Sequence, residues 1–213
     1  MNIKCLNIML LLKKNFLEKG IKRNNNALII PFGKCIIRNN GELQLNGNLL
    51  VNSNEKTRNR TGRSSIIKID SNGKIIVNKR FNIYYGADIV VFAGGEMILN
   101  GGFFNSNVTV RCRNRVQIGP DVAISHGVLI QDYDGHALFF TSADGKIDSP
   151  DNSAPITIGE HVLIAANVTI LKGVKIGDGA IIGAGSVVTH DIPAHTLAVG
   201  IPAKVIREGV DWK

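Results

Sequence analysis

A repeat of six residues in the second half of the chain constrains its fold more than any other feature. Nine hexads share one register, each opening on isoleucine or valine, and seven of them have a small residue in the fifth place. A six-residue repeat with two inward positions is typical of a β-solenoid, in which each hexad forms one short strand and one corner. Because three hexads complete a coil, residues 158–193 predict two full coils. The opening residues are Ile118, Ile124, Ile130, Ile158, Ile164, Ile170, Ile176, Ile182 and Val188.

The repeat breaks at the stretch QDYDGH, which ends at position 136. The next hexad would open at that position, where the chain has His136 instead of an aliphatic residue. The repeat resumes at Ile158, and residues 137–154 are rich in Asp, Ser and Gly, which is the composition of a loop. We therefore expect a loop extension over 137–154 that leaves the solenoid directly after a histidine.

Upstream of the hexads, paired apolar residues recur at spacings of six to eight, with Asn and Gly between them. We interpret them as irregular coils up to about residue 104, with residues 41–51 as a candidate first coil; a separate β-domain is the alternative. The expected organisation is a cap segment over 1–30, the repeat domain over 31–208 and a tail over 209–213. The pairs are Ile67/Ile69, Ile75/Val77, Ile83/Tyr85, Ile89/Val91 and Met97/Leu99.

The cap segment carries a weak amphipathic pattern of Leu6, Leu10 and Leu17 with lysines between them. We expect a short helix that packs on the end of the solenoid, with membrane contact as the less favoured interpretation. The apolar run at 8–12 is too short to span a bilayer, and no cleavage pattern of a signal peptide follows it. The three cysteines are odd in number and show no CxxC spacing, which favours a reduced compartment. We therefore expect a cytoplasmic protein with at most peripheral membrane contact.

The formal net charge of +8 raises nucleic-acid binding as a function. The densest basic stretch, EKTRNRTGR at residues 55–63, contains no aromatic residue, and no nucleic-acid-binding motif accompanies it. We interpret it as a solvated loop and expect no nucleic-acid partner. Anionic small ligands and acidic polysaccharides suit a positive charge equally well.

The stretch PITIGEHVLIAANVTILKGVKIGDGAIIGAGSVVTHDIPAHTLAVGIPAKVIRE at residues 155–208 resembles the hexapeptide-repeat acyltransferases. Within them it is similar to the sugar O-acetyltransferases of galactosides, maltose, capsule and O-antigen, and to the xenobiotic acetyltransferases. The clear match covers about residues 105–208. The resemblance implies a left-handed parallel β-helix, a homotrimer with its active site between neighbouring prisms, and acetyl-CoA as the donor to a sugar or glycan hydroxyl.

The resemblance also places the catalytic histidine just before a loop that interrupts the coils, and this residue is His136. Acyl transfer to a hydroxyl needs a base that works near neutral pH, and histidine is the suitable side chain. Asp132 and Asp134 are near in sequence and could orient the imidazole, although turn chemistry at the base of the loop explains each of them as well. Backbone N–H groups near Ala165 and Ala166 are candidates for stabilising the oxyanion of the acetyl group.

For the donor, the resemblance carries over four further residues. Ala184 and Thr189 match positions that line the pantetheine groove, and Lys204 and Arg207 match basic positions near the nucleotide phosphates. On the acceptor side, Asn105 and Asn107 resemble an asparagine that contacts sugar in relatives. Two positions depart from the pattern: Leu163 stands where the family commonly has a tryptophan lining the acceptor region, and His190 where a lysine is usual.

Three other functions compete with sugar O-acetylation. One is N-acetylation of an amino sugar, and another is a structural solenoid without activity, for which Leu163 is the main argument. The third is a zinc carbonic anhydrase, which this type of solenoid also supports with three histidines from adjacent subunits. The five histidines show no such spacing, so we expect no metal; they are His126, His136, His161, His190 and His195.

Overall fold

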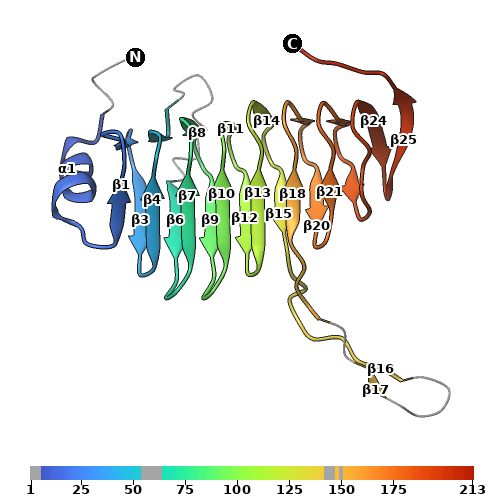
Figure 1. Ribbon diagram of the computed structural model, residues 1–213, viewed down its shortest axis with the longest axis horizontal. Coiled ribbons are helices and arrows are strands. Elements are labelled where there is room, and N and C mark those ends of the chain that lie inside the picture. The colour runs from blue at the N-terminus through green and yellow to red at the C-terminus, as the bar shows by residue number, and fades with distance from the viewer. Residues whose placement is uncertain (1–5, 54–63, 142–146, 149–150) are drawn as a thin grey trace.

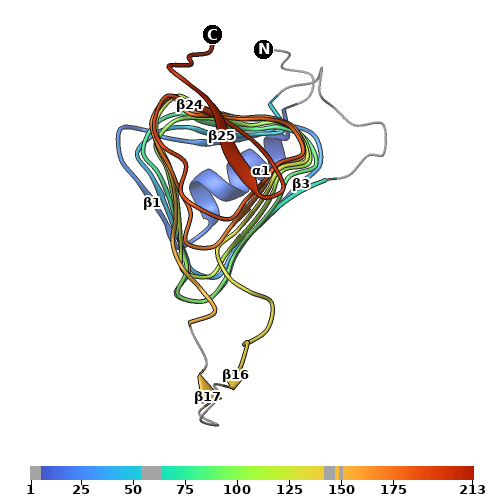
Figure 2. The same ribbon diagram turned by 90° about the vertical axis from the view of Figure 1, so that its right-hand side faces the viewer.

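The computed structural model describes residues 6–53, 64–141, 147–148 and 151–213, and in these ranges the chain winds into a three-walled prism of parallel strands (Figures 1 and 2). The basic stretch at 55–63 and Cys5 lie outside the described residues. In Figure 2, seen from the C-terminal end, the chain runs clockwise from wall to wall as it comes toward the viewer. The β-helix is therefore left-handed, as the resemblance implies and against the right-handed crossover usual for parallel strands.

Each wall is one sheet, and successive parallel strands of a wall come from successive coils. Wall I contains β1 (Ile21–Arg23), β4 (Glu42–Leu45), β7 (Lys74–Val77), β10 (Glu96–Leu99), β13 (Arg115–Ile118), β18 (Ile156–Ile158) and β21 (Lys175–Ile176). Wall II contains β2 (Ile29–Pro31), β5 (Leu49–Val51), β8 (Phe81–Ile83), β11 (Gly102–Phe104), β14 (Val122–Ile124), β19 (Leu163–Ile164), β22 (Ile181–Ile182), β24 (Thr196–Gly200) and β25 (Ala203–Glu208). Wall III contains β3 (Cys35–Asn39), β6 (Ser65–Ile69), β9 (Asp88–Val91), β12 (Thr109–Cys112), β15 (Leu129–Gln131), β20 (Thr169–Leu171) and β23 (Val187–Val188).

The interior of the prism confirms the hexad register. All nine opening residues are at most 2% exposed, and like residues stack from coil to coil: Ile158 pairs with Ile176, eighteen residues further on. The fifth residues are buried too, except Asp134 in the interrupted hexad. Stacking branched aliphatic residues removes the apolar surface of each coil from water, which is the main stabilisation available to so thin a solenoid.

The irregular upstream residues are earlier coils of this same solenoid, because β7, β10 and β13 are adjacent strands of one sheet. The alternative interpretation, that these residues form a separate β-domain, is therefore wrong. Residues of adjacent coils pair at separations of 22 and 19 residues, so these coils have longer corners than the hexads. One more coil precedes residues 41–51, since β1 pairs with β4, and its first strand begins at Ile21 within the expected cap segment.

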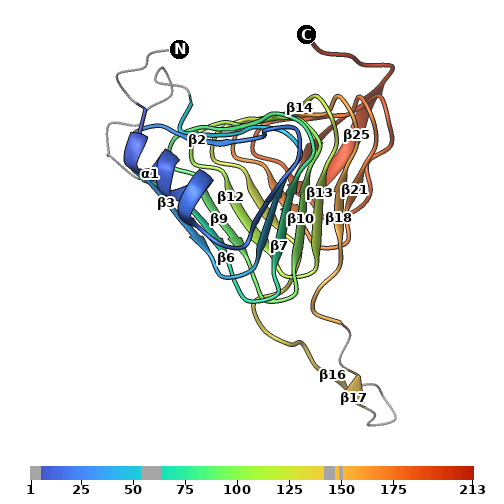
Figure 3. The same ribbon diagram turned by 60° about the vertical axis from the view of Figure 1, so that its left-hand side comes forward.

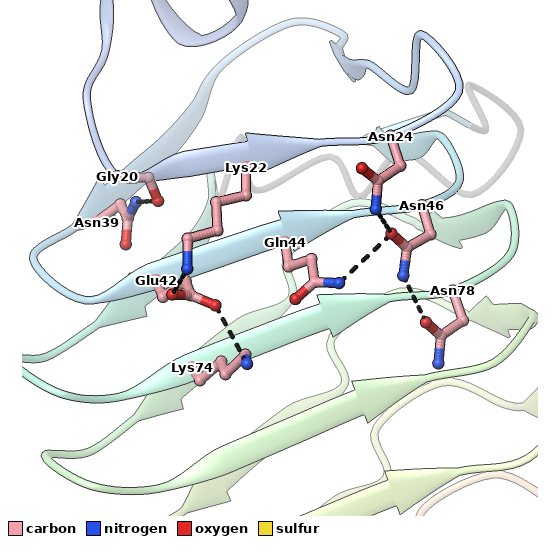
Figure 4. A network of polar contacts seen from close by, with 9 residues as sticks. All are labelled: Gly20, Lys22, Asn24, Asn39, Glu42, Gln44, Asn46, Lys74 and Asn78. Atoms are coloured by element: carbon pink, nitrogen blue, oxygen red, sulfur yellow. Dashed lines mark hydrogen bonds and ion pairs between the residues drawn. The ribbon is translucent and has the colours of Figure 1, made fainter.

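Asparagines reinforce the corner between walls I and II in the first coils (Figure 4). The side chain of Asn24 donates to Asn46 at 2.7 Å, Asn46 donates to Asn78 at 2.8 Å, and Asn78 donates to Asn100 at 2.8 Å. On wall I, Glu42 accepts from the lysines of the coils on either side. Each of these side-chain contacts joins one coil to the next. Together they stabilise the stacking of the first coils, whose repeat is less regular.

A short helical segment covers the N-terminal end of the prism (Figures 1 and 3). It consists of α1 (Ile8–Leu12), capped by the Asn7 side chain, and of a π-helical turn, η2 (Lys13–Leu17). The expected helix is therefore present, and no helix of the described residues is long and apolar enough to cross a membrane. At the other end, β25 folds back antiparallel on β24.

Candidate active site

The solenoid is interrupted at the corner between walls III and I, directly after β15, where the sequence predicted the extension. The segment leaves the prism and its described part includes a hairpin of β16 (Phe140–Thr141) and β17 (Ile147–Asp148) (Figures 1 and 2). Its two arms are joined at the base: Asp134 N–H donates to Asn152 O at 2.7 Å, and Ala154 N–H donates to Asp132 O at 2.9 Å. The extension therefore starts from a fixed base.

The carboxylate of Asp132 holds this base to the preceding coil. Its side chain is fully buried and accepts hydrogen bonds from the N–H groups of Arg113, at 2.7 Å, and Asn114, at 2.9 Å. Burial raises the pKa of the Asp132 carboxyl, and the two N–H groups oppose that rise by stabilising its charged form. The Asp132 carboxylate thus pairs with two backbone N–H groups in the corner after β12, where the described part of the next coil has no strand available to accept from them.

Asp134 is bound on the opposite side, toward the following coil. Its carboxylate lies 2.7 Å from the Nζ of Lys172, which also donates to Asp151 O at 3.0 Å. Neither Asp132 nor Asp134 contacts the His136 imidazole among the residues that the structure describes. The contacts of both aspartates in one chain fit the alternative interpretation, that they fix the base of the loop.

His136 lies on the outgoing arm of the extension and is exposed. Its imidazole makes no hydrogen bond or ion pair with any described residue of its own chain. The residues that follow it are apolar and also exposed: Leu138, Phe139 and Phe140 expose 50, 69 and 55% of their surface. A row of exposed apolar side chains beside a histidine indicates a surface that another molecule covers.

Five of the other predicted site residues gather at the corner between walls II and III. The turns of four coils lie above one another there, linked by backbone hydrogen bonds of 2.9–3.1 Å. Asn107 and Asn167 adopt positive φ values of 59° and 57°, a conformation that asparagine tolerates better than most residues. This corner places Asn105, Asn107, Ala165, Ala166 and Ala184 along one edge of the prism.

Two of the alanines at this edge differ in what their backbone can donate. The N–H of Ala165 is already bound to Ile182 O at 2.9 Å. The N–H of Ala166, like that of Ala184, makes no hydrogen bond to a described residue, and both lie in exposed or half-buried turns. Of the two expected oxyanion donors, Ala166 therefore has the available N–H.

A depression of about 410 Å³ adjoins Asn107 on wall III. Asp88 lines it, and the carboxylate of Asp88 accepts two hydrogen bonds of 2.6 and 3.1 Å from the guanidinium of Arg111. No local sequence pattern indicates this pair, because the two residues are 23 positions apart and only the coil register brings them together. The depression is lined by Ser64, Ile66, Gly86, Ala87, Asp88, Asn107 and Thr109.

The remaining predicted residues lie elsewhere on the prism. Leu163 projects from the outer face of wall II, next to Ala123 and Ile181 of the adjacent coils. Thr189 follows β23 at the corner between walls III and I, with its hydroxyl 2.8 Å from the Nδ1 of His190. Lys204 and Arg207 are exposed on β25 at the C-terminal end.

One chain therefore does not bring His136 to the edge that carries Asn107, Ala166 and Ala184. The two corners are the opposite edges of wall III. One hexad, which forms one wall and its corner, has six residues. At about 3.3 Å per residue of extended chain, the two edges of a wall are therefore separated by roughly 20 Å. The predicted site is divided between two edges of the same prism.

The cysteines and histidines suggest no other centre in the described ranges. Burial raises the pKa of Cys35 to about 11 and that of Cys112 further, so both thiols stay protonated at neutral pH. The five histidines are spread over all three corners and the extension. Among the described residues, no three His, Cys, Asp or Glu side chains gather as metal ligands would.

Comparison with known proteins agrees with this fold. The profile of the bacterial transferase hexapeptide family (six repeats) matches residues 155–190. The galactoside O-acetyltransferase of Escherichia coli (strain K12) is 40% identical over 121 residues, which cover 56% of this chain and 58% of that protein. The 2,3,4,5-tetrahydropyridine-2,6-dicarboxylate N-acetyltransferase of Enterococcus faecalis (strain ATCC 700802 / V583) is 49% identical over 59 residues, 28% of this chain and 25% of that protein.

Among solved structures, the crystal structure of the polySia-specific acetyltransferase NeuO matches with a TM-score of 0.55 and 25% identity. That match covers 92% of this chain and 90% of the other, so it includes the irregular coils. The chain spans less than two thirds of the length of the curated relatives named above. In repeat and in fold it is similar to the hexapeptide-repeat acyltransferases, which confirms the resemblance inferred from its sequence.

Proposed function

We propose that the protein is an acetyl-CoA-dependent O-acetyltransferase that acts on a hydroxyl of a sugar or glycan. One observation carries the proposal: the hexads stop at a histidine on an anchored extension, while five of the other expected site residues line the edge between walls II and III. The E. coli relative is named for galactoside O-acetylation, and NeuO for acetylation of polySia. Both names point to carbohydrate acceptors.

In this proposal the protein works as a homotrimer, and each site is shared by two chains. The extension of one chain lies against the edge between walls II and III of its neighbour. Its exposed apolar residues, including Phe139 and Ile147 at 69 and 66%, would then be covered by protein. A closed ring of three copies allows every chain to lend its His136 and to receive one.

His136 acts as the general base. Its imidazole takes the proton of the acceptor hydroxyl while the oxygen attacks the carbonyl carbon of the acetyl thioester. The Ala166 N–H of the neighbouring chain donates to the oxyanion that forms on the carbonyl oxygen. When the carbon–sulfur bond breaks, the imidazolium returns its proton to the departing thiolate. Asp132 and Asp134 hold the base of the extension, so they position His136 through the backbone.

The remaining residues serve recognition. Ala184 of one chain, with Ala165 beside it, and Thr189 at the facing edge of its neighbour line the groove for the pantetheine arm. Lys204 and Arg207 pair with the nucleotide phosphates. Asn105 and Asn107 hydrogen-bond the hydroxyls of the acceptor. Leu163 supplies an apolar contact where relatives have an aromatic ring, so this acceptor pocket differs in shape from theirs.

N-acetylation of an amino sugar is the second candidate, because a relative named as an N-acetyltransferase is 49% identical over 59 residues. The C-terminal coils carry most of the proposed donor residues, and these residues do not distinguish an oxygen from a nitrogen acceptor. Paired acceptors that differ only in a hydroxyl or an amine at one carbon separate the two functions. Release of free thiol from acetyl-CoA gives the rate for each.

Mixing two inactive variants tests the shared site. One variant is His136→Ala and the other is Asn107→Gly, since glycine removes the amide and keeps the positive φ. Each variant alone is expected to be nearly inactive. After unfolding and refolding together in equal amounts, about one site in four combines an intact His136 with an intact Asn107, as expected for random assortment of subunits. The mixture should recover roughly that share of wild-type activity.

A mixture as inactive as its components, with mixed trimers shown by mass spectrometry, would place the whole site in one chain. Light scattering gives the independent check on assembly. A monomer that keeps full activity would contradict the homotrimer, and wild-type protein that binds no acetyl-CoA would contradict the enzymatic function.

A further inference from the structure

The helical segment at the N-terminal end of the prism has its polarity reversed. Its polar residues Lys14 and Asn15 point into the protein and are 4 and 7% exposed. Its large apolar residues point away from the protein. Ile8, Met9, Leu12, Phe16 and Leu17 expose 58, 84, 49, 70 and 77% of their surface. The sequence pattern of leucines and lysines predicted the opposite for Leu17.

Hydrogen bonds fix this orientation. The Asn15 amide pairs with both backbone groups of Ile29, donating to its carbonyl at 2.8 Å and accepting from its N–H at 3.0 Å. It therefore closes the open edge of the first coil, where no further strand can pair. Lys14 is paired with Glu18, and the Arg23 guanidinium donates to Lys14 O at 2.6 Å. Turning the apolar face inward would break all of these contacts.

The outward apolar face is continuous with a depression of about 650 Å³. Apart from Asn7, Lys13 and Glu18, the side chains around it are apolar: Met9, Leu10, Leu12 and Leu17. An exposed apolar patch rimmed by polar residues marks a surface that binds a partner or a membrane. We call this surface, formed by residues 8–19, the cap face.

The charge of the molecule is concentrated around the cap face. Between Leu6 and Asn39 the chain has seven lysines and arginines and one acidic residue, Glu18, so six of its eight net positive charges lie in the cap and the first coil. Lys13 and Lys19 are exposed on the cap itself. On the first coil, each wall or its adjoining corner adds an exposed cation: Lys22, Lys34 and Arg38.

We propose that the cap face docks on the surface of an anionic phospholipid bilayer. Apolar side chains with a rim of lysine and arginine are the composition of interfacial helices, which bury the former and attract acidic headgroups with the latter. A second copy docked end to end would bring the two positive caps together, and that repulsion opposes such a dimer. A polyanionic chain would satisfy the cations and leave the apolar side chains in water.

The geometry of docking follows from the position of the cap face on the end of the prism (Figures 1 and 3). Contact through this end stands the solenoid upright, with β24 and β25 farthest from the bilayer. The proposal does not depend on the enzymatic function, because it uses none of the residues assigned to acetyl transfer.

Co-sedimentation of the full chain with vesicles tests the proposal. The vesicles are phosphatidylcholine alone, or phosphatidylcholine mixed with phosphatidylserine, each at low and at high salt. The wild type should bind the mixed vesicles at low salt and lose binding as salt screens the charges. Met9→Ser with Phe16→Ser should weaken this binding about tenfold or more, given the apolar area that each side chain buries.

Matched variants separate the effect from general changes in charge or polarity. Lys13→Gln with Lys19→Gln should weaken binding, whereas Lys175→Gln, an exposed lysine on the C-terminal part of wall I, should not. Ile206→Ser, an apolar residue 62% exposed at the other end, should bind as the wild type does. All the substituted side chains are exposed, so unchanged thermal unfolding is expected.

Three outcomes would overturn the proposal. They are a wild type that binds neither vesicle, cap variants that bind as the wild type does, and equal binding to both lipid compositions. A concentration-dependent doubling of the assembly mass that Phe16→Ser abolishes would assign the cap face to a second copy instead.

Discussion

The indole ring of Trp212 lies flat on the imidazole of His161, with the ring centroids 4.5 Å apart and 11° between the planes. The indole N–H donates to His161 O at 2.8 Å, and the His161 Nδ1 lies 2.6 Å from an Asp121 carboxylate oxygen. Asp211 lies 3.1 Å from the other ring nitrogen. The C-terminal segment is thus held over the corner between walls I and II. We call this arrangement the C-terminal clasp.

The clasp is expected to depend on pH. The hydrogen bond between the His161 imidazole and Asp121 raises the pKa of His161. The carbonyl of Trp212 and the carboxylate of Asp211 raise this pKa too, whereas desolvation lowers it. A raised histidine pKa adds stability that is full below the unfolded value of about 6.5 and is lost as pH rises through the folded value. The pKa of Asp211 is lowered, so its contribution is present above about 3.9 and is lost as pH falls. The clasp is therefore tightest between about pH 4 and pH 6.5.

Tryptophan fluorescence measures this directly, because Trp212 is the single tryptophan of the chain. Emission should shift to longer wavelength as pH rises above the His161 pKa and the ring becomes more exposed to water. Asp121→Asn should move the midpoint to lower pH. A midpoint that Asp121→Asn leaves unchanged would show that another group controls the clasp.

His136→Ala should lower kcat by about 10²–10⁴-fold, the usual contribution of a general base. Acetyl-CoA binding, followed by calorimetry, should stay close to that of the wild type, because the imidazole acts on the acceptor. His195→Ala is the control, since this exposed histidine lies at the corner between walls I and II, away from the proposed site. A His136→Ala enzyme with most of its activity would exclude the imidazole as the base.

Arg207→Gln should raise the KM for acetyl-CoA more than it lowers kcat. A contact with a phosphate of the donor is equally strong in the ground state and the transition state, so it contributes to binding and little to the chemical step. The substitution should weaken the free energy of acetyl-CoA binding by about 1–3 kcal/mol, as for the loss of other hydrogen bonds to charged groups. Initial rates over a range of donor concentrations give both constants, with Lys175→Gln as the control. A fall in kcat at constant KM would be inconsistent with this role.

Asp132→Asn should loosen the extension. The carboxylate accepts two backbone hydrogen bonds, whereas an amide offers one oxygen and places an NH₂ against the second N–H. We expect a loss of about 1–3 kcal/mol in the free energy of unfolding, measured by denaturant titration. Because His136 lies four residues further along the same arm, kcat should fall as well. Unchanged stability would mean that the base of the extension is held by its backbone bonds alone.

The solenoid could be predicted from the sequence because each hexad carries its own signal. Ile158, Ile164 and Ile170 each mark the buried position of one wall, and the following coil repeats the same spacing. The bounds of the first coils could not be predicted in this way, because their longer corners make the spacing of the buried residues irregular. The strand that begins at Ile21 was also assigned to the cap segment. The position of the extension at His136 was predictable for the same reason, as a gap in a regular count.

The contacts made between coils could not be predicted from the sequence. Asp132 and His136 are near in sequence, which suggested a pair, but the register of the coils places the Asp132 carboxylate against Arg113 and Asn114. His161 and Trp212 are 51 positions apart, and the Asp88–Arg111 pair also joins distant residues. Such pairs leave no local pattern, because they depend on how the chain is stacked.

Because each coil adds one strand spacing to every wall, the number of coils fixes a length. Wall III reaches β15, from which the extension departs, four strands after β3 in the first coil. At about 4.8 Å per strand this is roughly 19 Å. With the cap face on a bilayer, the chain would hold the base of the extension that carries His136 at a constant height above the headgroups. Inserting or deleting one whole coil would raise or lower that height by a single step and leave the chemistry at the edge unchanged.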